Sequence, residues 1–263
     1  MSPRSVRRKI AVATWRPPTE ARIHARTEVD VTAALTHLDS LRERTGVRVT
    51  LTHLVGPALG RALREVPEAR SRVVLGRTVR TDDCTVAFAV DIEDGTDLGP
   101  VRVEHADRLT SVQVAQRLEA VVDALRSDED RHHRRTSTLV RVAPWWVMRP
   151  VMATASLLVG GAGVPAFGQP GRPLGTAFVS NVGPLGLDEA YLAPAPFART
   201  AVYLAVGSVR ERPVVVDGEV VARPTVVLVA TADHRLLDGA HAGRLQRVVT
   251  DLLADPAALD VAG

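Results

Sequence analysis

The residues in this sequence best suited to chemistry are a histidine and an aspartate four positions apart, His234 and Asp238, with Gly239 directly after the aspartate. An imidazole takes up and returns a proton near neutral pH more readily than other side chains. A histidine followed at this spacing by Asp-Gly should occur by chance about 0.04 times in a chain of this composition. The structural alternative is that Asp-Gly forms a turn and that His234 is a partly buried polar residue.

The elements around this motif predict that it lies at the end of a strand. An apolar strand is expected over 225–230, and a closing helix with Leu245, Val249 and Leu253 on one face follows the motif. Loops at strand ends commonly hold active-site residues. The position of the motif therefore favours a functional role for His234.

The remaining pattern predicts helices first and strands later. A helix capped by Thr32 should end at Gly46. A second helix should cover about 52–65, and a third should begin near Thr110. Asp217-Gly218 between β-branched residues predicts a hairpin, which excludes an all-parallel sheet. Strands are expected over residues 73–75, 85–90, 176–180, 201–209, 214–216 and 220–221. The predicted fold class is therefore α/β, or α+β layered, with a mixed β-sheet packed with helices.

The composition is that of a folded soluble protein. The chain has 263 residues, of which 46% are hydrophobic and 24% charged, which suffices for a sizeable core in one large or two small domains. The single cysteine, Cys84, excludes a disulfide-stapled secreted scaffold, and the apolar run after the basic N-terminus is too short for a signal peptide. These features favour a cytoplasmic protein.

Three other classes of partner are not expected. The 33 basic residues are nearly balanced by 30 acidic ones, and no stacking or recognition motif indicates nucleic acid. His132 and His133 lie beside acidic residues 128–130, but adjacent ligands in a charged run are typical of a solvated loop rather than a metal site. The uncharged run 150–171 reaches the length of a membrane span, yet prolines and glycines interrupt it, so an apolar flap or a subunit contact is favoured.

Several motifs follow one another in an order that is similar to one known family. The chain resembles the catalytic domain of the dihydrolipoamide acyltransferase (E2) subunits of 2-oxo acid dehydrogenase complexes, in the chloramphenicol acetyltransferase-like superfamily. The E2 signature D-H-R-x-x-D-G is reproduced at 233–239, and G-T-F-T-I-S-N-x-G is matched at 175–183. The other matching elements are at 7–11 (R-x-x-I-A), 28–32 (E-V-D-V-T), 98–101 (L-x-x-P-V-like) and 201–215 (A-I-L-x-V-G-x-V-x-x-R-P-V-V). The resemblance covers nearly the whole chain and implies a chloramphenicol acetyltransferase-like fold.

The resemblance implies an acyltransferase that moves an acyl group between coenzyme A and a thiol such as dihydrolipoamide. A thiol with a pKa of about 8.5 is mostly protonated at neutral pH, so its attack on a thioester needs a base. By motif position His234 is that base, and Ser180 donates its hydroxyl to the tetrahedral oxyanion. Asn181 is expected to anchor the strand end by hydrogen bonds. Coenzyme A, as acyl-CoA, is the expected substrate, and no metal is implied.

Supporting roles near the base are implied in the same way. Asp238 is expected to be mainly structural and to hold an arginine, for which Arg7 or Arg8 is the natural partner. Arg235 is expected to serve packing or an ion pair. Gly239 is expected to allow a close backbone turn that a side chain would obstruct.

The family active site lies between neighbouring subunits of a trimer, with the base and the serine on different chains. The resemblance therefore implies a homotrimer, and family trimers assemble further into shells. We expect a single catalytic domain over 1–263, with an atypical apolar insert at about 131–173 and without lipoyl or peripheral-subunit-binding domains. The one lysine, Lys9, lacks the acidic hairpin setting of a lipoyl site, so a lipoyl-domain protein would have to supply that group. Because the insert precedes Ser180, an altered acyl acceptor is a further hypothesis.

Two alternatives to this function stay open. One is a non-catalytic scaffold or assembly relative of the E2 core. The other is an acyl-CoA-dependent transferase that acts on a different small-molecule acceptor. The presence of both the His234 and the Ser180 motifs favours a catalytic protein over a scaffold.

Overall fold

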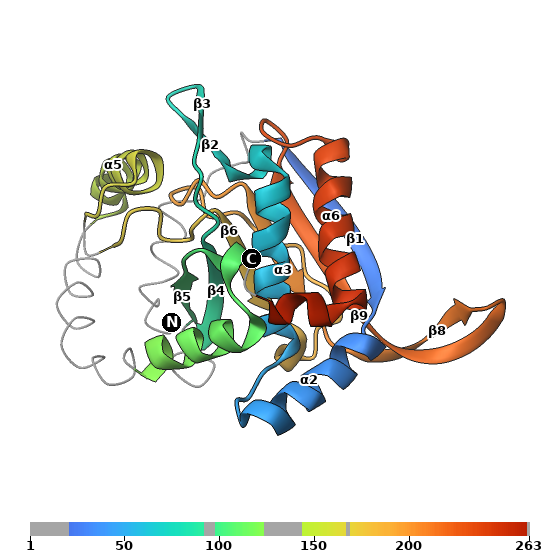
Figure 1. Ribbon diagram of the computed structural model, residues 1–263. Coiled ribbons are helices and arrows are strands. Elements are labelled where there is room, and N and C mark those ends of the chain that lie inside the picture. The colour runs from blue at the N-terminus through green and yellow to red at the C-terminus, as the bar shows by residue number, and fades with distance from the viewer. Residues whose placement is uncertain (1–20, 92–97, 124–143, 167–168, 262–263) are drawn as a thin grey trace, which may run out of the picture.

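A mixed β-sheet lies at the centre of the molecule (Figure 1). The computed structural model describes residues 21–91, 98–123, 144–166 and 169–261. The strand order is β1-β9-β7-β6-β4-β5, and β8 pairs with β9. Strand β6 runs parallel to β4 and β7, and the other pairs are antiparallel. The strands are β1 (Arg22–Asp30), β4 (Val86–Asp91), β5 (Leu98–Val103), β6 (Ala177–Asn181), β7 (Val202–Val206), β8 (Arg210–Val216) and β9 (Glu219–Asp233). The predicted mixed sheet is confirmed.

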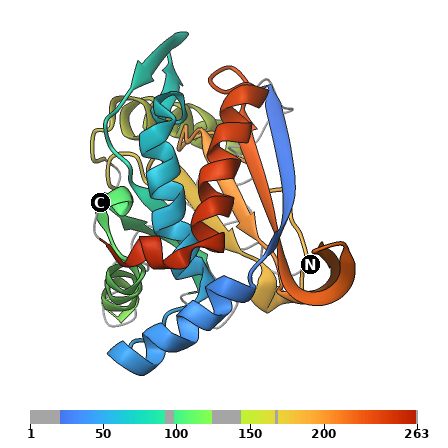
Figure 2. The same cartoon turned by 45° about the vertical axis from the view of Figure 1, so that its right-hand side comes forward.

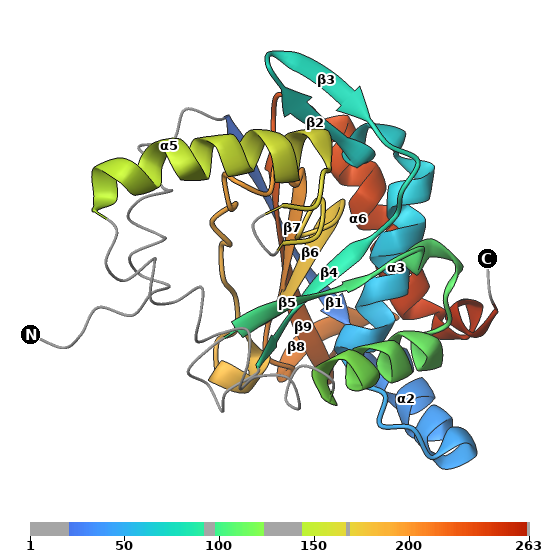
Figure 3. The same ribbon diagram turned by 90° about the vertical axis from the view of Figure 1, so that its left-hand side faces the viewer.

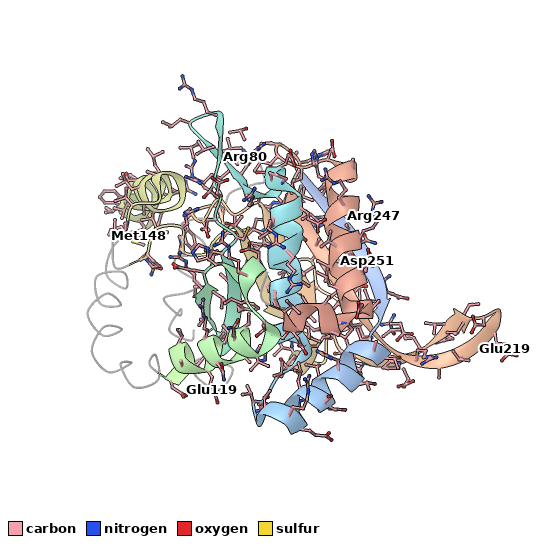
Figure 4. All side chains as sticks on the ribbon, viewed as in Figure 1. Arg80, Glu119, Met148, Glu219, Arg247 and Asp251 are labelled. Carbon is pink, nitrogen blue, oxygen red and sulfur yellow. The ribbon has the colours of Figure 1, made fainter. Side chains whose placement is uncertain are left out.

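Helices α3 and α6 lie side by side against one face of this sheet (Figure 1, Figure 2). In α6, Leu245, Val249 and Leu253 are buried, whereas Arg247 and Asp251 point away from the sheet (Figure 4). This spacing is the amphipathic pattern that the sequence shows. The helices are α2 (Thr32–Thr45), α3 (Leu51–Glu65), a helix over residues 111–123, α5 (Trp145–Ala155) and α6 (Gly239–Ala254). The predicted early helices and the closing helix are confirmed.

The start of α2 differs from the prediction in its cap. Val31 occupies the N-cap position and makes no side-chain hydrogen bond. Thr32 instead donates from its amide and its hydroxyl to Asp30 Oδ1, at 2.8 and 2.6 Å. A carboxylate accepts backbone N–H groups as readily as a hydroxyl does, so Asp30 takes the role expected of Thr32. Gly46 ends the helix with a φ of 69°, as predicted.

The centre of the sheet is buried on both faces, so β9 is apolar at successive positions. Residues 226–229 are each at most 2% exposed. Alternate residues of this run belong to the main core beneath the helices, and the others form a small cluster with Ala205, against which Leu192 packs. The loop between β6 and β7 therefore covers the face of the sheet that the helices leave open.

Two hairpins extend beyond the central sheet. One is a separate pair, β2 (Ser71–Val74) and β3 (Arg77–Arg80), and the other is the end of β8 and β9, with Glu219 near its tip (Figure 4). Asp217 and Gly218 have φ values of 52° and 88°, the left-handed conformations that a tight hairpin turn favours. The predicted hairpin is thus confirmed. The short helical turns are η1 (Pro67–Arg70), η2 (Ala106–Arg108), η4 (Gly183–Leu185) and η5 (Pro256–Asp260).

Residues 145–162 of the apolar stretch are helical, although prolines and glycines were expected to interrupt it. Helix α5 continues directly into a π-helix, η3 (Ser156–Ala162), close to β2 (Figure 3). Gly160 allows η3 to pack closely against Phe197, because a Cβ on residue 160 would overlap the carbonyl oxygen of Phe197. Arg72 Nε donates to Gly161 O at 2.8 Å, and Arg199 Nε to Ser156 Oγ at 3.2 Å. Among the described residues, no helix combines the length and the apolar character that a membrane span requires.

The close approach of α3 to η2 gives a test of the packing. A Cβ on Gly60 would lie 2.5 Å from the backbone nitrogen of Asp107, whereas a Cβ on Gly243 in α6 would meet no heavy atom within 4 Å. We expect Gly60→Ala to lower the free energy of unfolding by about 1–3 kcal/mol through overpacking. Gly243→Ala, the matched control, should raise it by up to about 1 kcal/mol because alanine favours a helix. Urea unfolding monitored by circular dichroism measures both, and equal effects would contradict the close approach.

Candidate active site

The loop that carries the histidine motif is tied to the sheet by backbone hydrogen bonds. At the end of β9, the Asp233 amide donates to Ala201 O at 3.1 Å, and the His234 amide donates to Ala21 O at 2.8 Å. The Leu237 amide donates back to Asp233 O at 3.0 Å, and the Leu237 side chain is 1% exposed. The turn is therefore held at its start and at its buried leucine, while the His234 side chain is exposed.

One hydrogen bond fixes which nitrogen of His234 can act as a base. His234 Nδ1 lies 2.7 Å from the carbonyl oxygen of Leu237. A carbonyl oxygen only accepts, so Nδ1 carries the proton, and Nε2 of the neutral ring has the free lone pair. The loop thus presents an oriented imidazole that can take a proton at Nε2.

The residues on either side of His234 hold the loop. Arg235 Nε lies 2.9 Å from Asp233 Oδ1 and 3.1 Å from Asp233 Oδ2, so the ion pair, one of the two roles expected for Arg235, is present. The steric role expected for Gly239 has no basis among the described residues. A Cβ on Gly239 would meet none of their heavy atoms within 4 Å, because the residue opens α6 at the surface.

Asp238 is the N-cap of α6, and the side chain it contacts is that of His241, three residues further along the chain. Asp238 Oδ1 accepts the His241 amide at 3.0 Å and lies 2.7 Å from His241 Nδ1. The His241 backbone N–H lowers the pKa of the Asp238 carboxyl. The expected arginine partners, Arg7 and Arg8, lie outside the described residues. The D-x-x-H spacing at a helix start could have indicated this capping pair.

Ser180 lies near the end of β6 and is partly buried. Its neighbour Asn181 donates from Nδ2 to Thr52 Oγ1 at 2.9 Å and accepts the Gly183 amide at Oδ1, also at 2.9 Å. These bonds join the end of β6 to the first turn of α3 and to the following loop. Asn181 therefore has the anchoring contacts expected of it.

Within one chain, Ser180 and His234 lie at opposite ends of the sheet. Ser180 of β6 pairs with Ala205 of β7, and Ala205 pairs in turn with Val229 of β9. Five further residues of chain lead from Val229 to His234, a distance of about 16 Å at roughly 3.3 Å per residue. A single thioester cannot contact both side chains at that separation, so the two residues do not form one site inside a single chain.

The Ser180 end contains a second histidine that sequence reasoning missed. His53 Nδ1 accepts the Thr50 amide at 3.1 Å in a capping box at the start of α3. Burial, with a smaller contribution from Arg48, lowers the pKa of His53 to about 4. A hollow of about 420 Å³ lies beside this helix start, lined by residues that include Leu51 and Asn181. The spacing Thr50-x-x-His53 was the available signal.

The His234 end has a positively charged cavity of about 210 Å³. Its lining includes Arg22, Arg199 and Arg235, with Asp233 as a carboxylate in the same lining. The π-helix η3 reaches this end through the hydrogen bond of Arg199 to Ser156. The described part of the apolar insert that contains η3 therefore lies at the His234 end of the sheet, although it precedes Ser180 in the sequence.

Two other kinds of chemistry, a reactive cysteine and a metal site, can be compared with the structure. Burial, followed by the charge of Asp107, raises the pKa of Cys84 to about 11, so its enclosed thiol is protonated at neutral pH and is not a nucleophile. Within the described part of the chain, no three histidine, cysteine or carboxylate side chains gather as a metal site. His132 and His133 lie outside that part.

The sequence matches the family described as 2-oxoacid dehydrogenases acyltransferase (catalytic domain) over residues 3–135 and 174–261. It is 40% identical over 82 residues to the dihydrolipoyllysine-residue succinyltransferase component of the mitochondrial 2-oxoglutarate dehydrogenase complex of Saccharomyces cerevisiae, which is 31% of this chain and 17% of that protein. It is 25% identical over 241 residues to the acetyltransferase component of the Staphylococcus aureus pyruvate dehydrogenase complex, 90% of this chain and 46% of that protein. The chain thus spans less than half the length of these relatives.

Solved structures confirm the fold. A probable dihydrolipoamide acetyltransferase from Listeria monocytogenes has a TM-score of 0.69 at 17% identity, covering 95% of this chain and 90% of that one. The cubic core of a pyruvate dehydrogenase multienzyme complex has a TM-score of 0.63 at 22% identity, covering 97% and 87%. A chloramphenicol acetyltransferase has a TM-score of 0.53 at 15% identity, covering 95% of both chains. The expected chloramphenicol acetyltransferase-like fold is confirmed.

The lowered pKa of His53 predicts a loss of stability in acid. The folded pKa of about 4 lies below the reference histidine pKa of about 6.5, so the unfolded chain binds the proton first as the pH falls. Between pH 6.5 and pH 4 the free energy of unfolding should drop by about 2–3 kcal/mol on this account.

Urea unfolding at several pH values tests this. His53→Gln keeps a side-chain acceptor for the Thr50 amide but has no proton to gain, so its stability should fall less in acid than that of the wild type. Parallel curves for the two proteins would show that His53 does not titrate in this way.

Proposed function

Because the chain belongs to the acyltransferase catalytic domains of the 2-oxoacid dehydrogenases, we propose that it moves an acyl group between coenzyme A and a thiol such as dihydrolipoamide. The observation that carries the proposal is the hydrogen bond from His234 Nδ1 to Leu237 O, because it leaves Nε2 oriented as a base. The positive cavity with Arg22, Arg199 and Arg235 at the same end suits the phosphates of coenzyme A.

The proposed steps use His234 twice. Nε2 takes the proton of the acceptor thiol, and the resulting thiolate attacks the thioester carbonyl carbon. The Ser180 hydroxyl donates a hydrogen bond to the oxyanion of the tetrahedral intermediate. When the carbon–sulfur bond to the leaving thiol breaks, His234 Nε2 returns the proton to that sulfur. Asp238 has a structural role in this scheme, as the cap that fixes the end of the loop.

We propose that each site forms between two chains of a homotrimer, with further assembly of trimers. The separation of about 16 Å between the levels of Ser180 and His234 supports this, because two chains can bring opposite sheet ends together. The fold shared with the cubic core of a pyruvate dehydrogenase complex is compatible with such an assembly.

We further propose one domain over 1–263 with an apolar insert and a protein that works in the cytoplasm. The family match leaves residues 136–173 out, which supports the insert. The buried free thiol of Cys84 suits a reducing compartment. Since the sequence has a single lysine, Lys9, a partner with a lipoyl domain is the proposed source of a lipoyl thiol.

Thiol release from acetyl-CoA, succinyl-CoA or a branched acyl-CoA in the presence of dihydrolipoamide tests the activity. His234→Ala should lower kcat by about 100-fold to 10,000-fold, the range for loss of a general base. His37→Ala, at a histidine that pairs with Asp260 at 3.1 Å outside the motif, is the control and should leave kcat unchanged. Equal rates for His234→Ala and the wild type, or no turnover of any donor, would contradict the catalytic function in favour of a scaffold.

Mixing two inactive variants tests the two-chain site. His234→Ala and Ser180→Ala chains, unfolded together and refolded as a mixture, should regain about a quarter of wild-type activity, because one random interface in four joins an intact His234 to an intact Ser180. Each variant refolded alone is the control. A mixture no more active than its components would place both residues in the same chain's site and contradict the proposal.

A further inference from the structure

We propose that His241 is a positioning residue for His234 and that it acts through the peptide group between Leu237 and Asp238. The inference rests on the proposed function, since it treats His234 as the base. It assigns a role in this reaction to a helix residue that lies outside the D-H-R-x-x-D-G signature.

The carbonyl side of this peptide group holds the base. Leu237 O lies 2.7 Å from His234 Nδ1. The position of that oxygen depends on Leu237, whose side chain is buried and whose amide bonds to Asp233 O at 3.0 Å. The other half of the same planar peptide group is the amide of Asp238, so a contact there also orients Leu237 O.

His241 supplies the contact on the amide side. The nitrogen of Asp238, in the same peptide group as Leu237 O, donates to His241 Nδ1 at 3.3 Å. The same Nδ1 lies 2.7 Å from Asp238 Oδ1. An unprotonated Nδ1 accepts from the amide, and a protonated Nδ1 donates to the carboxylate. Nδ1 cannot make both contacts at once, so His241 holds the amide in the neutral ring whose proton is on Nε2, the nitrogen that faces Glu68. In that form it orients, through the shared peptide, the carbonyl that fixes His234.

The far side of the His241 ring is anchored outside the loop. His241 Nε2 lies 3.8 Å from Glu68 Oε2 of η1, and Glu68 Oε1 lies 3.8 Å from Arg80 Nη2 of β3. Glu68 Oε2 is buried and has no hydrogen-bond partner among the described residues, so the imidazole beside it is its nearest source of compensation. Arg80 is the residue labelled on the β2–β3 hairpin in Figure 4. The ring thus connects the loop to the segment before β2.

The two hydrogen bonds between Asp238 and His241 are those of a capping box, and the contact of the ring with Glu68 goes beyond it. In a capping box the third helical residue needs one acceptor for the N-cap amide, and glutamate or glutamine supplies it. Asp238 also receives the backbone amide of residue 241, which any side chain there preserves. A change at His241 can therefore keep the half of the capping box made by the Asp238 carboxylate while it releases the Asp238 amide, and this separates positioning from stability.

Steady-state kinetics with acyl-CoA and dihydrolipoamide test the proposal in the full-length protein. We expect His241→Ala to lower kcat about tenfold with KM unchanged, because small misplacements of a catalytic group are costly. His241→Gln, which restores an acceptor for the Asp238 amide, should recover most of that loss. His37→Ala, which removes another histidine–carboxylate pair, should leave kcat unchanged. Thermal unfolding of all four proteins accompanies the kinetics.

A second measurement does not depend on activity. Nitrogen-15 NMR of histidine-labelled protein reports which ring nitrogen of His234 carries the proton, and His241→Ala should reduce the fraction protonated at Nδ1. An unchanged His234 tautomer together with unchanged kcat would overturn the positioning role and leave the proposed function intact. An inactive wild type in which His241→Ala still shifts the tautomer would refute the proposed function and support the contact. A fall in kcat that glutamine does not recover, with the tautomer unchanged, would also overturn the positioning role.

Discussion

The antiparallel pairing of β7 with β9 determines where each candidate catalytic side chain can lie. Because β9 runs against β7 while β6 runs with it, the chain leaves β9 at the end where β6 begins. The base and the serine are therefore carried to opposite ends of one sheet by the same ladder of hydrogen bonds. No change of side-chain rotamer can bring them together, since the distance is set by the backbone. The two-chain site proposed for this protein therefore follows from strand direction.

The sequence predicted the elements whose signals are local and repeated. Apolar residues at helical spacing located α2, α3 and α6, and Asp217-Gly218 located the hairpin, because these patterns reflect burial and turn geometry at the residues themselves. The motif at 233–239 also has a local explanation, since its turn is closed by bonds between its own residues. These parts of the fold and of the site could be predicted in detail.

Other features depend on residues distant in sequence and were missed or misjudged. The contact between His241 and Glu68 joins residues that lie far apart in the chain. The π-helix at 156–162 forms where Gly160 allows close contact with Phe197 and where Arg199 donates a hydrogen bond to Ser156. Helix propensity alone argues against a helix there. Gly239 was expected to be sterically required, yet no described residue lies within reach of a Cβ placed there. A motif predicts which residue type stands at a position. The physical reason for that type depends on the residues that surround it in the fold.

Arginine rather than lysine holds several backbone carbonyls in this fold. Arg61 donates to Ala258 O and Val261 O, both at 2.6 Å, and Arg72 and Arg199 do the same for Gly161 O and Val73 O. A guanidinium stays protonated at every physiological pH, whereas the amine of lysine in its neutral form attacks thioesters. A lysine at these positions would be exposed to acylation by the substrates proposed for this protein and would lose its charge. The arginine anchors are therefore chemically inert toward the acyl donors proposed for this protein.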